Sequence, residues 1–237
     1  MRKYYIDNLR VFCILLLFPF HTAMIFNNWG EAFYIHGGDS LPASFFMMCV
    51  YPWWMTLLFV IAGMSSYYAL SHRSVKEFVK ERVNKLLIPL LVGLVTIIPV
   101  QTYVADVFHN GYSGNFFEHY AVYFTRFTDL TGYDGGFTLG HLWSGILFLL
   151  GLAKSFFNKT NPLMSYLSTA AFPLYYFHQT ILVVLGMLVL KYVDEMWIQY
   201  VIVCFGTLIL SVLCYEICRR NHITAKIFGI KEKKKIT

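Results

Sequence analysis

Charged residues are scarce along this sequence. Lysine, arginine, aspartate and glutamate make up 14% of its 237 residues, whereas apolar residues make up 57%. A soluble domain carries about 25% charged residues, so this composition excludes an ordinary water-soluble globular protein. No long polar stretch is present either, which excludes a second, soluble domain. We therefore expect an integral membrane protein whose single domain covers residues 1–237.

Several motifs of soluble, redox and hydrolytic proteins are also missing. The five cysteines form no Cys-x-x-Cys pair and have no metal-type spacing, so we interpret them as small buried apolar residues and expect no metal site. No Gly-x-Ser-x-Gly motif is present, and nothing therefore indicates a covalent serine. Repeated halves and paired broken helices are absent as well, which disfavours a transporter.

Long apolar runs are what the sequence has instead. Six stretches contain about 20 predominantly apolar residues, the length that a membrane-spanning helix needs. We therefore expect an all-α bundle of about six transmembrane helices. The predicted spans are residues 10–27, 53–70, 86–105, 139–157, 164–190 and 196–218. The segment FFEHYAVYFTRF, residues 116–127, predicts a further short amphipathic helix along the interface.

Positive charge is concentrated in alternate connecting segments. Of the 19 Lys and Arg residues, 17 lie in residues 1–10, 72–85, 154–159 or 219–237. Because cytoplasmic loops carry an excess of Lys and Arg, we expect a multi-pass protein of the bacterial inner (plasma) membrane. Both termini are then cytoplasmic, and residues 106–138 form an outer loop. Four tryptophans fall near predicted outer boundaries, as in an aromatic belt. They are Trp29, Trp53, Trp54 and Trp197. The net charge of +6 reflects this asymmetry, so the lipid bilayer is an expected partner and nucleic acid is not.

Two ionisable residues interrupt the first apolar run. Arg10 and His21 are 11 positions apart, which is about three helical turns plus roughly 20°, so both project from one face about 16 Å apart along the axis. An ionisable side chain deep in a membrane is costly and by default indicates a function. Arg10 alone equally fits a snorkelling anchor paired with Asp7, and His21 alone fits a neutral core histidine. The two residues by themselves leave both interpretations open.

Further histidines and cations fall at matching depths in other spans. The histidines lie at mid-depth or nearer the outside, where they would line a pocket that opens outward. They are His21, His178 and His141. The cations lie at the cytoplasmic edge below them. They are Arg10, Arg82 and Lys85. This order predicts a site with two parts, a cationic inner end and a proton acceptor deeper in the membrane.

The segments that carry these residues resemble a known family. YIDNLRVFCILLLFPFH, in which ten residues separate Arg10 and His21, is similar to the first span of the acyltransferase-3 family of membrane O-acyltransferases. LLFVIAGMSSYYAL followed by FVKERVNKLLIP is similar to that family's second span and basic segment, and GHLW and YYFHQTIL also match. The details of PFHTAMIF, of GHLW and of the tail NHITAKIFGIK resemble the glucan-biosynthesis protein C (succinyltransferase-like) branch.

The resemblance implies a membrane O-acyltransferase with no permanently bound cofactor. Acyl-CoA, the donor substrate, approaches from the cytoplasm, and an acyl group of acetyl or succinyl type passes to a hydroxyl of a glycan or other cell-envelope acceptor. His21 is implied as the general base, and His178 or His141 as the group that orients it or donates to the oxyanion. The implied acyl-CoA ligands are Arg10, Arg82 and Lys85, and the supporting residues are Asp7, Trp143 and Gln179.

Two alternatives to this interpretation stay open. Members of the family have several more spans between the segments that correspond to HLW and FHQ, whereas only a short hydrophilic link joins them here. A non-catalytic or accessory protein with a shortened middle region is therefore the first alternative. His21 and His178 at matched depth on two helices also fit a bis-histidine haem site, so a haem-binding membrane protein is the second.

Overall fold

Every regular element in the described part of the chain is a helix, as expected. The computed structural model describes residues 4–29, 33–123 and 161–230. Its elements are α1 (Tyr4–Ile25), α2 (Leu41–Leu70), α3 (Val75–Arg82), η1 (Val83–Leu87), α4 (Ile88–Thr96), α5 (Ile98–His109), α6 (Phe116–Tyr123), α8 (Pro162–Tyr192), α9 (Met196–Cys218) and α10 (His222–Ile227). The short element η1 is a π-helix, and the others are α-helices.

Five helical stretches are long and apolar enough to cross a membrane. They are α1, α2, the run Val75–His109, α8 and α9. They correspond to five of the six predicted spans, and the remaining one, residues 139–157, lies outside the described residues. The predicted helix within residues 116–127 is confirmed over its first part as α6. The chain is thus an all-α protein whose described helices are suited to a bilayer.

The predicted start of the second span, at residue 53, is wrong. Helix α2 begins at Leu41, because Ser40 caps it by accepting a hydrogen bond from the Ala43 N–H at 3.4 Å and a proline occupies its first turn. Pro52 does not end the helix. Ending the helix inside a membrane would leave several backbone N–H and C=O groups without water to bond to. A membrane helix therefore tends to continue through a proline, which frees only one carbonyl group.

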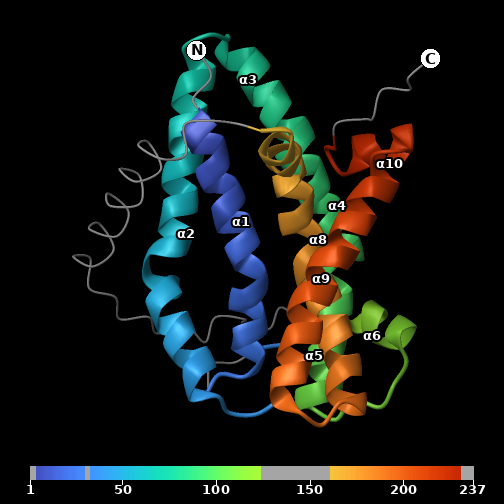
Figure 1. Cartoon of the computed structure of the whole chain (residues 1–237). Coiled ribbons are helices and arrows are strands. Elements are labelled where there is room, and N and C mark those ends of the chain that lie inside the picture. The colour runs from blue at the N-terminus through green and yellow to red at the C-terminus, as the bar shows by residue number, and fades with distance from the viewer. Residues whose placement is uncertain (1–3, 30–32, 124–160, 231–237) are drawn as a thin grey trace.

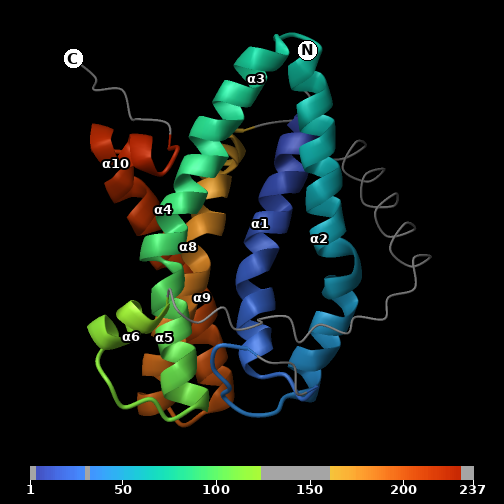
Figure 2. The same cartoon turned by 180° about the vertical axis from the view of Figure 1, so that it is seen from behind.

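Helix α1 is the centre of the bundle. It packs against α2, α8 and α9, while α8 packs along α9 and receives α5 on another side. Figure 1 shows α1 between α2 and the α8–α9 pair. In Figure 2 α3, α4 and α5 follow one another as a long bent rod, with α6 beside α5. Helix α1 begins at the end of the bundle where α3 and α10 lie, which we call the α3 end.

A proline accounts for the π-helix in the third span. Pro89 has no N–H to donate to the carbonyl of Lys85, and its ring would crowd that carbonyl in a regular α-helix. The turn before it widens, so that the Ile88 N–H bonds to the carbonyl of Val83, five residues back. Single π turns of this kind occur frequently at functional sites. Here the π turn contains Lys85, one of the predicted ligands.

The predicted basic tail, residues 219–237, is folded as far as the structure describes it. Helix α10 ends in a Schellman turn, in which the Ile230 N–H bonds to the carbonyl of Ala225 at 2.8 Å and Gly229 has a φ of 62°. The ring of Phe228 lies 5.2 Å from that of Phe177 on α8. The tail therefore packs back onto the bundle, and its KEKKK segment lies outside the described residues.

Candidate functional site

Within the described residues, a cavity of about 1390 Å³ lies at the α3 end of the bundle. Its walls come from α1, α2, α3, η1, α8 and the turn after α10, so segments distant in the sequence meet there. Pockets for ordinary small ligands have volumes of roughly 300–1,000 Å³. The size of this cavity suits a larger or longer ligand.

The cavity gathers all three predicted cations. Its lining contains four basic and two acidic side chains, which gives it an excess of positive charge. The basic side chains are Arg10, Arg73, Arg82 and Lys85, and the acidic ones are Asp7 and Glu81. A concave, partly apolar wall with a net excess of one sign of charge attracts the opposite charge. This end of the molecule is therefore arranged to receive an anion.

Arg10 is held by partners on two helices. Its Nη1 atom lies 3.3 Å from Oδ1 of Asp7, which confirms the predicted pair one turn apart on α1. Its Nη2 atom donates to Oγ of Ser65 on α2 at 2.7 Å. Ser65 was not predicted, although two adjacent serines inside an apolar run are a signal that polar contacts form there. Together the two partners fix the guanidinium at the cavity wall.

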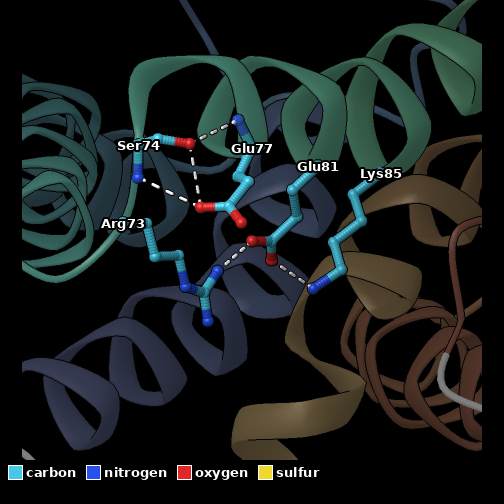
Figure 3. A network of polar contacts seen from close by, with 5 residues as sticks. All are labelled: Arg73, Ser74, Glu77, Glu81 and Lys85. Atoms are coloured by element: carbon cyan, nitrogen blue, oxygen red, sulfur yellow. Dashed lines mark hydrogen bonds and ion pairs between the residues drawn. The ribbon is translucent and has the colours of Figure 1, made fainter.

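The cations of α3 and η1 are held differently. Arg82 stacks over the ring of Phe78, with its guanidinium carbon 4.8 Å from the ring centroid. Lys85 pairs with Glu81 at 2.5 Å, and Arg73 from the end of α2 pairs with the other oxygen of the same carboxylate. Figure 3 shows Glu81 between these two cations. Arg73 and Glu81 were missed from the sequence because only the turn between α2 and α3 brings them together.

His21 and His178 lie side by side, although they are far apart in the sequence. Their ring centroids are 5.2 Å apart and their planes are tilted by 42°. Nδ1 of His178 lies 2.6 Å from the carbonyl oxygen of Tyr175, and because a carbonyl only accepts, this nitrogen carries the proton. Nε2 of His178 and Nδ1 of His21 are buried without a hydrogen-bond partner among the described residues. Within the described part of the chain, the pair thus has one ring nitrogen on each histidine that makes no hydrogen bond.

Aromatic side chains enclose His21. The ring of Trp54 lies 5.9 Å from it edge-on, and that of Phe33 stacks at 6.1 Å. His109 on α5 bonds to the carbonyl of Phe33 at 2.6 Å, which ties the loop before α2 to this place. Trp54 is buried and donates to the carbonyl of Cys13 at 2.8 Å, so its interpretation as part of an aromatic belt is wrong. It packs inside the bundle, against the helix that carries His21.

The cavity and the histidine pair follow one another along the same two helices. The cavity reaches Ile14 on α1 and Tyr175 on α8. His21 lies about two turns beyond Ile14, and His178 lies about one turn beyond Tyr175. Neither histidine belongs to the cavity wall. The two parts of the predicted site are therefore neighbours along α1 and α8.

Of the remaining predicted site residues, the structure describes Gln179 but not His141 or Trp143. Gln179 follows His178 on α8, and its Oε1 atom is buried without a partner among the described residues. His141 and Trp143 lie outside the described residues. The haem alternative fits poorly, because a porphyrin must lie between its two axial imidazoles and these rings are already in contact.

Comparison with known proteins matches part of this chain to one family. A family model described as an acyltransferase domain matches residues 3–144, a range that contains Arg10, His21 and the third-span cations but not His178. The glucans biosynthesis protein C of Escherichia coli K12 (DH10B) and that of Escherichia coli O157:H7 (EC4115) are each 30% identical to this chain over 94 residues. That stretch covers 39% of this chain and 24% of each relative, so the match spans about a quarter of their length. No solved structure matches.

Proposed function

This chain belongs to the acyltransferase-3 family, and from that premise we propose that it is a membrane O-acyltransferase. In this proposal an acyl group of acetyl or succinyl type passes from cytoplasmic acyl-CoA to a hydroxyl of a glycan or other cell-envelope acceptor. The supporting observation is the sequence of features along α1 and α8, where a cation-lined cavity is followed by two adjacent histidines. The relatives are named for glucan biosynthesis, which supports a glycan as the acceptor.

The cavity is the proposed donor site. Coenzyme A carries phosphates at one end and a thioester at the other, and the cavity has cations at one end and leads toward the histidines at the other. In the proposal Arg82 and Lys85 bind the phosphates. Lysine acts there as a point charge, whereas arginine offers a planar fork of donors. Arg10, fixed by Asp7 and Ser65, binds phosphate or orients the pantetheine arm.

His21 is the proposed general base. The acceptor hydroxyl oxygen attacks the thioester carbonyl carbon, and the new C–O bond forms as the C–S bond breaks. The hydroxyl proton passes to His21 and from there to the departing thiolate, so that the products are an ester and free CoA. Nδ1 of His21 has no hydrogen-bond partner among the described residues, which supports this role, because a histidine kept for packing alone is expected to have its buried nitrogens bonded.

His178 is proposed to orient His21 rather than to donate to the oxyanion. In the neutral ring the proton on Nδ1 is committed to the Tyr175 carbonyl, so Nε2 has only a lone pair. This lone pair is able to accept a hydrogen bond from the imidazole of His21, and the bond would stabilise His21 when that ring becomes positively charged. The 5.2 Å separation of the ring centroids supports this assignment by proximity, and in the proposal the hydrogen bond forms when a ring turns, because Nε2 of His178 has no partner among the described residues.

We expect transfer activity to be measurable directly in membranes. Membranes that contain the chain should move label from acetyl- or succinyl-CoA into a glycan fraction and release free CoA, whereas membranes without it should not. The two products are measured separately by scintillation counting and by a thiol reagent. If a folded, membrane-inserted chain transfers label from none of the acyl-CoA donors, the proposal fails and the non-catalytic alternative gains support.

The proposed location is the bacterial inner membrane, with the α3 end and both termini in the cytoplasm. A cysteine at Lys76, exposed on α3, should react with an impermeant maleimide only when the cytoplasmic side is opened. A cysteine at Ser113, exposed between α5 and α6, should react from outside in intact cells. The parent chain with its own five cysteines gives the background. The reverse pattern would overturn the orientation and, with it, the cytoplasmic donor.

A further inference from the structure

Glu81 occupies the space between two of the cavity's cations. One of its carboxylate oxygens pairs with Arg73 and the other lies 2.5 Å from Nζ of Lys85. The cations come from different elements, since Arg73 follows α2 and Lys85 lies in the π turn η1. Figure 3 shows the three side chains converging from these elements. The same three residues line the cavity, so their contact is part of its wall.

A second acid nearby serves the local fold instead. Ser74 and Glu77 form a capping box at the start of α3, in which the Glu77 carboxylate accepts from the Ser74 N–H at 3.1 Å and from its hydroxyl at 2.9 Å. This explains why α3 begins here. Glu77 does not line the cavity, although it borders a smaller hollow together with Glu81 and Lys85. The two glutamates, one helical turn apart, therefore have separate tasks.

The position of Glu81 is chemically that of a bound anion. A carboxylate bridging a guanidinium and an ammonium makes the contacts that two oxygens of a phosphate would make with the same groups. Both cations stay accessible, because the side chains of Arg73 and Lys85 are 51% and 58% exposed. Glu81 is less exposed, at 33%. A phosphate can thus reach Arg73 and Lys85, but it must compete with the Glu81 carboxylate that already pairs with both.

We propose that Arg73 is an additional phosphate-binding residue of the donor site and that Glu81 is an internal competitor for Arg73 and Lys85. This inference rests on the proposed function, because it assigns both residues to the site of a phosphate-bearing donor. Without ligand, Glu81 holds the two cations at the cavity wall. A phosphate of the ligand takes its place, and the strength of binding is limited by the need to displace it.

The test compares two variants with the same change of charge. Glu81→Gln should tighten CoA binding by roughly three- to tenfold at low ionic strength, since it removes a competing charge from a partly screened site. Glu77→Gln should tighten CoA binding clearly less than Glu81→Gln, because glutamine retains the capping box and Glu77 forms no ion pair with Arg73 or Lys85 among the described residues. Arg73→Gln should weaken binding and reduce its dependence on salt. Binding is measured by calorimetry on the purified full chain, with inorganic pyrophosphate as a second probe.

The two probes separate failure of the inference from failure of the proposed function. If CoA does not bind but pyrophosphate binds and Glu81→Gln tightens it, the competitor role stands and the CoA donor falls. If Glu81→Gln leaves the binding of both probes unchanged or weakens it, the inference is overturned. The inference is also overturned if Glu77→Gln tightens binding as much as Glu81→Gln, because the effect is then one of overall charge. It is overturned as well if neither probe binds to the wild type or to any variant.

Discussion

Replacing His21 by glutamine should remove turnover and leave CoA binding nearly intact. Glutamine keeps a donor and an acceptor of similar reach, but an amide does not take up the proton. General-base catalysis contributes about 10²–10⁴-fold, so the rate of acyl transfer should fall by that factor or more. Binding should persist because the cavity that holds the cations ends about two turns before His21. Transfer in membranes and CoA binding to the purified chain measure the two effects separately.

The matched control is a histidine that makes no contact with this site. His36 lies exposed on the loop before α2, with Nε2 3.4 Å from a carboxylate oxygen of Asp39. His36→Gln makes the same chemical change and should leave the rate within about twofold, as expected for a surface substitution. If His21→Gln retains most of the activity, His21 is a packing residue and the assignment of the base is wrong.

Much of the fold follows from the sequence because apolar length is a strong signal. Five predicted spans and a short amphipathic helix correspond to helices of the structure. The errors lie where proline or glycine chemistry decides locally. Pro52 was compatible with a span that begins at residue 53, yet α2 continues through it. The folding back of residues 219–230 was not predicted either, since the positive φ of Gly229 and the closeness of its backbone to that of Lys85 are visible only in the structure.

The candidate site was predictable only in part. The spacing of Arg10, Asp7 and His21 is a property of one helix, so it was available from the sequence. The match in depth between His21 and His178 followed from the direction of the spans. Contacts between elements were not available, and these include Ser65 with Arg10 and Arg73 with Glu81. Such pairs depend on how the helices cross and turn, which residue spacing does not encode.

These missed contacts change the interpretation of the cations. From the sequence, Arg82 and Lys85 were equally well explained by the charge bias of cytoplasmic loops. In the structure both line one cavity together with Arg10, which comes from a different span. A charge bias alone does not require cations from separate helices to converge on one hollow.

His178 should act together with His21, and a double-mutant cycle should show it. His178→Asn keeps a donor near the position of Nδ1, and therefore the bond to the Tyr175 carbonyl, but removes Nε2. Alone it should lower turnover by about tenfold or more. This loss corresponds to an interaction between the two histidines in the range of about 0.5–3 kcal/mol that is measured for residues in contact.

Combined with His21→Gln, His178→Asn should lower turnover no further, because residues that act as a unit lose their function only once. Thr180→Val is the matched control on α8, since it removes a 2.7 Å hydrogen bond to Gln101 on α5 without touching either histidine. It should cost about 0.6 kcal/mol of stability and leave turnover unchanged. If the two histidine variants multiply in their effects, each histidine acts independently, and the role of His178 as the group that orients His21 is wrong.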